Sequence, residues 1–311
     1  MEGIDFEALA DRVRNWGRWG SEDGRGTLNH IDAAALMRAT DAATTGKMFG
    51  LGLRFDGNGP MDGRFRRNPK LYVTALDQMI DPNNPRARFS DDDINMSLQC
   101  ATQWDALSHS HYDGMLYNGC KACDTLSVHG ASRNGVEHMA MPGVLSRGIL
   151  LDIARLKGVD VLPSDYGITP ADLDEAVDRA NLTVEPGDII LVRTGLMSRF
   201  TSGSDRTALS SPHSGLAGEC AGWLFDKSAA AVASDTVAVE RIGPDTMSGD
   251  MPLPLHMLCL RDMGLPLGEM WDLDALAADC AEDGRYSFLL SASPIAITGA
   301  FGAPINPTVL K

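Results

Sequence analysis

The chain has 311 residues, of which 44% are hydrophobic and 22% charged, and its formal net charge is −15 at pH 7. An acidic surface repels both nucleic acid and anionic membranes, so we expect neither as a partner. No apolar run approaches the roughly 20 residues of a membrane helix. The N-terminal stretch also lacks the apolar core of a signal peptide, so we expect a cytoplasmic protein. Length alone allows one large domain or two modest ones.

The first third of the chain mixes helices, strands and one long loop. Helices are expected at 5–16 and 32–42. Asp32 is the expected N-cap of the second helix. Strands are expected at 71–76 and 94–100, and one should begin within 47–55. The Gly- and Pro-rich loop 56–70 carries three arginines and a lysine. It could be a mobile cover, a subunit contact or a solvated loop, and we favour the solvated loop.

Strands and helices alternate in the second half. Short apolar runs, typical of strands buried on both faces, lie at 148–153, 188–195 and 229–235. Further strands are expected at 286–291 and 295–298, and helices at 169–181, 215–227, 254–263 and 272–282. Thr169 is the expected N-cap of the first of these helices, with Pro170 in the first helical position. The hairpin-like strand clusters near both ends of the chain predict a mixed α/β sheet.

The stretch 101–114, ATQWDALSHSHYDG, gathers acidic, imidazole and aromatic side chains. Asp105 and His109 would share a face if the segment were helical. His109 and His111 would share a face if it were extended. Either geometry permits a compact polar site, although polar loop residues are usually solvated.

A second candidate lies in the segment 252–273, where His256 and Glu269 stand among apolar residues. A lone histidine on an apolar helix is more often a satisfied core residue. A carboxylate in such a run is costly to bury alone, so it usually has a metal, a cation or a donor network as partner. The occurrence of both residues in one short segment favours a functional site.

Together these segments resemble the cyclase family whose best-known members are bacterial kynurenine formamidase and isatin hydrolase. The family motif H-x-G-T-H-x-D-x-P-x-H aligns with residues 99–109, where Thr102, Asp105 and His109 match. His256 and Glu269 resemble the downstream pair that completes the family's zinc or manganese site. Similar segments at 14–29, 146–158, 185–195 and 234–236 extend the resemblance over nearly the whole chain.

The resemblance implies a swivelling β/β/α fold with a mixed central sheet, formed as a single domain over residues 1–311. It also implies a homodimer or homotetramer, in which an N-terminal arm, 1–30, contributes to the pocket or to a subunit contact. The implied activity is hydrolysis of a cyclic amide, a lactone or a formamide. In this activity His109 would move the proton, and Asp105, His256 and Glu269 would hold one divalent metal ion.

The departures from the motif bear on the metal. Gln99 and Gln103 replace two family histidines, and an amide oxygen is a poorer zinc ligand than imidazole. With Gln103 adding an oxygen, the remaining set favours manganese or magnesium over zinc. One alternative is a metal-independent lyase, a dehydratase or cyclase, that uses His109 and Glu269 as acid and base. Another is a degenerate site that only binds a ligand, although the retained His109 argues against this reading.

Aromatic walls would suit a ring-containing small molecule. We expect the substrate-binding residues to be Trp16, Trp19, Tyr112 and His138. His30, His129 and His213 are expected outside the pocket. The chain shows neither the nucleophile elbow of a serine hydrolase nor the complete glycine fingerprint of a dinucleotide-binding protein.

Overall fold

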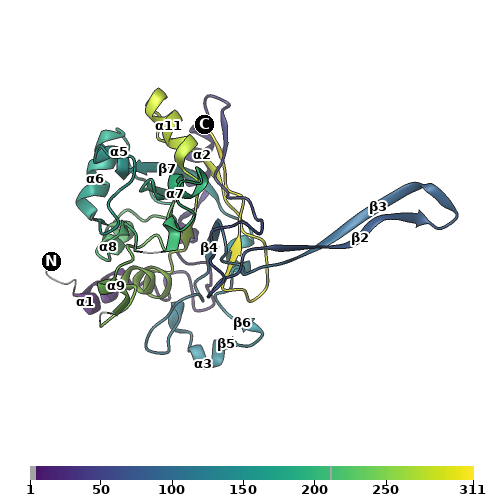
Figure 1. Cartoon of the computed structure of the whole chain (residues 1–311). Coiled ribbons are helices and arrows are strands. Elements are labelled where there is room, and N and C mark those ends of the chain that lie inside the picture. Colours follow the sequence, from purple (N-terminus) through teal and green to yellow (C-terminus); the bar gives the residue numbers. More distant parts are fainter. Residues whose placement is uncertain (1–4, 211, 249) are drawn as a thin grey trace.

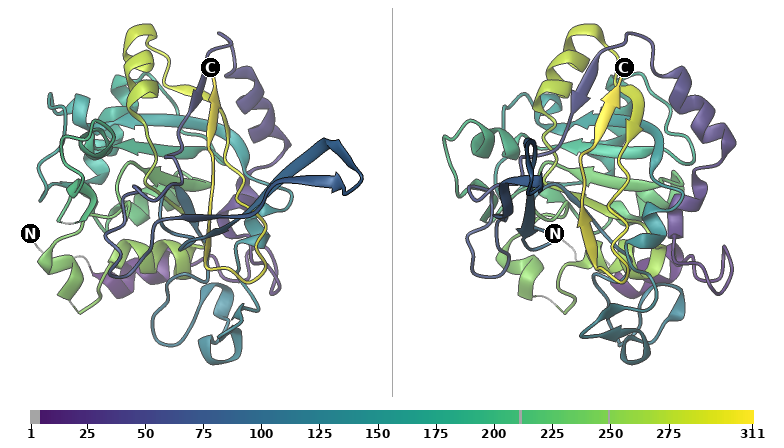
Figure 2. Two further views of the ribbon diagram at one scale, coloured as in Figure 1. Left: turned by 45° about the vertical axis from the view of Figure 1, so that its right-hand side comes forward. Right: turned by 90° about the vertical axis from the view of Figure 1, so that its right-hand side faces the viewer.

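A computed structural model of the chain, which describes residues 5–210, 212–248 and 250–311, is organised around one mixed nine-stranded sheet (Figures 1 and 2). In spatial order its strands are β1 (Met48–Gly50), β15 (Thr308–Leu310), β13 (Ser287–Ser291), β7 (Leu145–Asp152), β9 (Ile189–Arg193), β11 (Ala231–Ser234), β12 (Leu267–Glu269), β4 (Gln103–Asp105) and β14 (Gly302–Pro304). The four strands β7, β9, β11 and β12 are parallel and lie at the centre. Antiparallel strands flank them on both sides, so the predicted mixed sheet is confirmed.

The central strands are buried on both faces. In β7, Ile149 and Leu151 point into one hydrophobic core, whereas Leu150 points into a second core. Ile190 and Leu191 of β9 divide between the two cores in the same way. Because both faces are covered there, apolar residues follow one another in these strands without the alternation of a half-exposed strand. The strands expected from the apolar runs 148–153, 188–195 and 229–235 are therefore confirmed, with ends shifted by a few residues.

Helices cover the sheet. The α-helices are α1 (Phe6–Val13), α2 (Ala33–Asp41), α3 (Ala122–Thr125), α4 (Glu137–Ala140), α5 (Ile153–Leu156), α6 (Pro170–Arg179), α7 (Leu196–Thr201), α8 (Cys220–Asp226), α9 (Pro244–Ser248), α10 (Pro254–His256) and α11 (Asp274–Asp283). Three 3-10 helices, η1 (Gly26–His30), η2 (Tyr117–Gly119) and η3 (Ala208–Ser210), and a π-helix, η4 (Met257–Met263), complete the helical elements. Helices α1, α8 and η4 pack together over the first core, and α2 packs on β7 and β13. Within the described ranges, no helix has the length and apolar character needed to cross a bilayer.

The predicted helix caps are confirmed. The side chain of Asp32 accepts a hydrogen bond from the amide of Ala35 at 2.8 Å, at the start of α2. Thr169 and Asp172 form a reciprocal capping box at the start of α6, with Pro170 in the first turn. Each cap satisfies amide groups that the first helical turn leaves without partners.

Three of the expected elements need correction. Residues 96–100 are not a strand, because Ser97 hydrogen-bonds with Arg67 and the chain turns there toward β4. Residues 295–298 make a local turn in which the amide of Ile297 donates to the carbonyl of Ile295. The helix expected at 215–227 begins only at Cys220, because Gly215–Leu216 form β10, which pairs with β8 (Gly167–Ile168).

A long hairpin projects from the body of the molecule (Figures 1 and 2). Its strands are β2 (Lys70–Asp81) and β3 (Asn84–Asn95), and we call residues 70–95 the hairpin arm. The arm forms a separate two-stranded sheet, as do the short strands β5 (Leu126–Ser127) and β6 (Gly130–Ala131). The strand expected at 71–76 is therefore half of a strand twice as long.

Candidate active site and metal centre

Two neighbouring antiparallel strands bring three polar side chains together. In the β4–β12 pair, Gln103 lies directly opposite Glu269. Asp105 follows Gln103 by two positions, so the period of a strand places both on the same face. Trp104, between them, points into the second core and fixes this register. The strand pair thus brings together Gln103, Asp105 and Glu269. Neither a helical nor an extended conformation of 101–114, considered alone, predicts this grouping.

His256 is held beside this group by Glu240. The Glu240 carboxylate accepts hydrogen bonds from the amides of Leu255 and His256, at 2.9 and 3.2 Å, and from Nδ1 of His256 at 2.9 Å. With Nδ1 engaged, Nε2 of His256 faces Glu269 Oε1 at 3.7 Å. A carboxylate behind a histidine fixes the tautomer and orientation that a metal ligand needs.

The donor set fits a divalent cation. Asp105, His256 and Glu269 each offer one ligand atom, and these atoms lie within 4.8 Å of one another. Among the described residues, Oδ2 of Asp105 and Oε1 of Gln103 are buried without a hydrogen-bond partner. Buried polar atoms are rarely left unpaired, so the two oxygens indicate that a further group binds here. The structure therefore contains a candidate metal-binding group at these residues.

Positive and amide groups already lie against the carboxylates. Nη1 of Arg66 is 3.2 Å from Glu269 Oε2. The side-chain nitrogen of Gln103 donates to Glu269 and lies 3.3 Å from Asp105 Oδ1. Burial, together with the neighbouring Glu269, raises the pKa of Asp105 well above its ordinary value. Burial acts the same way on Glu269, but His256 and Arg66 outweigh it and lower that pKa.

His109 lies at the edge of this group. The chain turns after β4, where the amide of His109 donates to the carbonyl of Ala106 at 2.9 Å, and Nε2 lies 3.8 Å from Asp105 Oδ1. Burial lowers the pKa of His109 to about 4, so the ring is neutral at pH 7. A neutral imidazole can accept a proton from a reacting group.

The group opens into a cleft of about 630 Å³. Its lining includes His109, His213, His256, Glu269, Arg66, Pro60, Met61, Phe65, Leu209, Val237, Ile242, Met247 and Leu253. Two expectations are corrected here. Loop 56–70 is not simply solvated, because Arg66 and its neighbours line the cleft. His213, expected outside the pocket, lies in its wall, with Nδ1 2.8 Å from the carbonyl of Ser214.

The four residues expected to bind substrate lie elsewhere. Trp16 donates through its indole nitrogen to the carbonyl of Arg261 at 2.8 Å and packs on the first core. Trp19 meets the ring of His30 edge to face, and the phenol of Tyr112 donates to Asp262 at 2.9 Å.

A Cβ atom on Gly24 would lie 3.1 Å from the ring of His138. None of these four side chains lines the cleft of the chain as described. Residues 5–30 pack on α8, η4 and η2 of their own chain, mainly because Trp16 and the 20–23 turn hydrogen-bond there.

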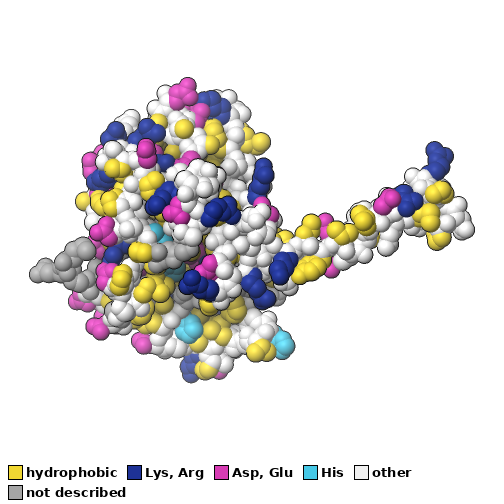
Figure 3. Space-filling view, in the orientation of Figure 1, with side chains coloured by type: hydrophobic (Ala, Val, Ile, Leu, Met, Phe, Trp, Pro, Cys, Tyr) yellow, Lys and Arg dark blue, Asp and Glu magenta, His cyan; other side chains and the backbone are white. Residues whose placement is uncertain are grey.

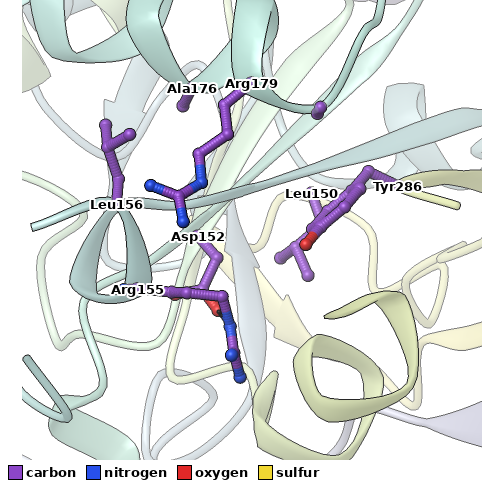
Figure 4. Close-up of a pocket in the computed structure, with 8 residues that line it drawn as sticks. Leu150, Asp152, Arg155, Leu156, Ala176, Arg179 and Tyr286 are labelled. Carbon is purple, nitrogen blue, oxygen red and sulfur yellow. Dashed lines mark hydrogen bonds and ion pairs between the residues drawn. The ribbon is translucent and has the colours of Figure 1, made fainter. Parts of the chain in front are cut away.

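A second hollow lies beside β7, α5 and α6 (Figure 4). It holds only about 20 Å³, which suits a water molecule. Its carboxylate, Asp152, is paired with Arg155 at 3.3 Å and with Arg193 at 3.0 Å. We therefore interpret the charged residues around this hollow as a paired cluster that supports the fold.

Comparisons with known proteins agree with this architecture. The family model described as "Putative cyclase" matches residues 29–241, and the chain belongs to this family. A crystal structure of a novel cyclase shares 38% identity, with a TM-score of 0.87 over 97% of this chain and 99% of that chain. The mixed sheet and its α/β surroundings match that structure, which confirms the predicted cyclase-type fold.

More distant structures share the fold. Isatin hydrolase A from Labrenzia aggregata, bound to benzyl benzoate, is 17% identical, with a TM-score of 0.62 over 91% of this chain and 98% of that chain. A predicted metal-dependent hydrolase from Bacillus stearothermophilus is 16% identical, with a TM-score of 0.52 over 85% and 97%. No curated protein gave a match. The similar structures are cyclases or hydrolases, which supports an enzymatic activity for this chain.

Proposed function

We propose that this protein is a metal-dependent hydrolase that opens a cyclic amide, a lactone or a formamide. The observation that carries the proposal is the orientation of His256. Its Nδ1 is occupied by Glu240, so its Nε2 and the carboxylates of Asp105 and Glu269 converge on one point. Such convergence of one nitrogen and two anionic oxygens is unfavourable without a cation or a proton between them.

The ion would be held by Asp105, His256 and Glu269. Rotation of the Gln103 amide by half a turn would exchange its nitrogen for Oε1, which would then add a fourth ligand. Oxygen-rich sets of this kind favour manganese or magnesium. When bound, a divalent ion polarises a carbonyl group and lowers the pKa of a water molecule.

The protein's own residues handle the protons. His109 lines the cleft, is neutral at pH 7 and lies beside Asp105, so it can accept the proton of the attacking water. The water oxygen bonds to the carbonyl carbon, the C–N or C–O bond breaks, and His109 returns the proton to the departing nitrogen or oxygen. Arg66 faces the same point and can bind the oxygen on which negative charge develops.

The cleft walls suit a ring. Phe65, Leu209, Val237, Ile242 and Met247 supply apolar surface. His213, with Nδ1 donating to the carbonyl of Ser214, presents Nε2 as an acceptor for a substrate N–H or O–H group. Apolar walls with a few convergent polar groups are typical of small-molecule sites. The isatin hydrolases that share the fold support a ring-containing substrate.

A second candidate is a metal-independent lyase, and one observation favours it. Arg66 and the Gln103 amide nitrogen already bind Glu269. Burial would lower the pKa of His256, but Glu240 and Glu269 raise it to about 10, so a proton could take the place of the cation. His109 and Glu269 would then share the proton transfers of a dehydration or ring closure.

Metal analysis of the purified protein separates the two candidates. For the hydrolase, we expect one divalent ion per chain, loss of that ion in Asp105→Asn, and hydrolysis of a cyclic amide, lactone or formamide that stops on chelation and returns with manganese. Glu137→Gln, which alters a carboxylate outside the site, is the control. A metal-free protein whose activity survives chelation would exclude the hydrolase as proposed and support the lyase.

A further inference from the structure

Arg66 is the only lysine or arginine among the described residues that line the cleft. Its side chain is 17% exposed, and the Glu269 side chain that it faces is 2% exposed. Nη1 of Arg66 donates to Glu269 Oε2 and to the carbonyl of Gln99, at 3.2 Å in each case. A hydrogen bond between two charged groups is stronger than one between neutral groups. The loop arginine is therefore held on one of the candidate metal ligands.

This contact involves the same carboxylate that a metal ion needs. Oε2 of Glu269 already accepts hydrogen bonds from Arg66 and from the amide nitrogen of Gln103. An ion held with Asp105 and His256 would have to take an oxygen of this carboxylate as well. Two positive charges on one buried carboxylate repel each other strongly, because little water lies between them. Arg66 and an ion would therefore compensate Glu269 in turn rather than together.

The loop that carries Arg66 is exposed at its tip and closed at its base. Residues 62–65 are all exposed, and the side chain of Phe65 is 91% exposed. At the base, the side-chain nitrogen of Asn68 donates to two carbonyls of the same loop, at 3.1 and 2.8 Å. A movement of the exposed tip could therefore take the guanidinium away from Glu269 while the base of the loop keeps its hydrogen bonds.

Another arginine of loop 56–70 has quite different surroundings. Arg64 pairs with Asp62 at 3.2 Å, and the two side chains are 89% and 46% exposed. On the face of the molecule in Figure 3, Lys and Arg side chains are likewise spread among acidic ones. Exposed pairs of this kind contribute little, because solvent screens the charges. Arg66 instead faces a buried carboxylate, where the same positive charge has a much larger effect.

We propose that Arg66 is a tethered cation that competes with the metal ion for Glu269. In the metal-free protein the guanidinium compensates the buried carboxylate, and an ion that binds displaces it into the cleft. The displaced guanidinium is then free to bind the oxygen on which negative charge develops, a step that rests on the proposed function. Metal affinity and the position of the loop are linked as a result, since whatever draws Arg66 away from Glu269 strengthens metal binding.

Metal binding to three variants tests the competition. Arg66→Met and Arg66→Gln both remove the positive charge, and the second keeps a hydrogen-bond donor for the carbonyl of Gln99. Arg67→Met is the matched control, because it removes the same charge from an exposed side chain one residue away, outside the lining of the cleft. Near-UV circular dichroism reports whether each variant is folded.

Isothermal titration calorimetry of the metal-free proteins, with manganese and zinc in turn, gives the affinities. We expect both neutral variants to bind manganese at least about tenfold more tightly than wild type, because a repelling charge is removed. Arg67→Met should stay within about threefold of wild type, because solvent screens an exposed charge. A fixed excess of manganese should also raise the urea midpoint of the neutral variants by more than that of wild type. Where turnover is measurable, Arg66→Met should be slower than wild type at saturating manganese, in spite of its tighter metal binding.

Equal or weaker manganese binding by the folded neutral variants would overturn the inference and leave the proposed function untouched. A gain in affinity that Arg67→Met shares would also overturn it, because net charge alone would then explain the result. If wild type binds neither ion while the neutral variants bind manganese, the competition is supported and the metal-dependent hydrolase falls. If none of the proteins binds either ion, both proposals fall.

Discussion

Glu240→Gln isolates the part of the site on which the proposed function depends. Glu240 touches no candidate ligand position except through His256, and its carboxylate accepts three hydrogen bonds from Leu255 and His256. The variant keeps the size of the side chain but removes its charge and leaves one acceptor oxygen for three donors. We therefore expect His256 to lose its fixed orientation while the rest of the donor set stays in place.

Two magnitudes follow from this geometry. Loss of an outer-shell partner of a metal-bound histidine weakens metal affinity by about 10–100-fold. A buried donor left without a partner also costs about 1–3 kcal/mol of unfolding free energy. Isothermal titration calorimetry with manganese measures the first quantity, and urea unfolding of the metal-free protein measures the second.

Glu137→Gln is the matched control, because Glu137 accepts a hydrogen bond from the amide of Gly299 at 3.0 Å outside the cleft. It should change manganese affinity little. If Glu240→Gln bound manganese as tightly as wild type while its fold was intact, orientation by Glu240 would not matter, and the reasoning that joins His256 to a cation would be refuted.

Three further predictions concern catalysis, stability and pH. His109→Ala should lower kcat by about 10²–10⁴-fold, as expected for loss of a general base. Its metal content, measured by mass spectrometry, should equal that of wild type. Thr169→Ala removes the N-cap of α6 and should lower the unfolding free energy by about 1 kcal/mol, measured by urea unfolding. Burial and nearby Arg18 lower the pKa of His30 from 6.5 to about 4, so the unfolded state binds a proton first as the pH falls. The stabilising effect of neutral His30 is complete above pH 6.5 and is lost toward pH 4. The unfolding free energy of His30→Gln, measured by urea unfolding, should therefore fall less steeply with decreasing pH than that of wild type. Parallel curves of unfolding free energy against pH would contradict the sign of this effect.

The long, uniformly apolar elements could be predicted from sequence. Runs such as 188–195 predict strands buried on both faces, because a strand that is covered on both sides favours apolar side chains at successive positions. Strands of three residues, such as β4, β12 and β14, are too short to show a period. Pairing with neighbouring strands of the sheet stabilises these short strands, so no local sequence pattern predicts them.

The residues of the candidate site likewise divide into those that the sequence could identify and those that it could not. Asp105, His109, His256 and Glu269 could be selected from motif spacing and from charge in an apolar context, and the structure brings them together. Arg66 is one of several loop arginines, and it pairs with Glu269, which lies 203 residues away in the sequence. Nothing local distinguishes it from Arg64 or Arg67.

Two other residues escaped sequence reasoning, His213 and Glu240. A buried acid such as Glu240 had a detectable signal, because it stands in a largely apolar stretch just after a predicted strand. His213 had none, since its surroundings in sequence are ordinary polar residues. An aromatic residue led to the opposite error. Trp16 was expected to line the pocket, but its indole N–H donates to a carbonyl at the edge of the core.

Charge balance at Gln103 connects the two candidate chemistries. Two buried carboxylates as close as Asp105 and Glu269 cannot both stay ionised without compensation. A histidine at position 103 would offer one lone pair to a cation, whereas the amide offers either a donor nitrogen to the carboxylates or an oxygen to an ion. In the two proposed chemistries, the Gln103 side chain would therefore serve the site both with and without metal. Arg66 would supply a positive charge in both states.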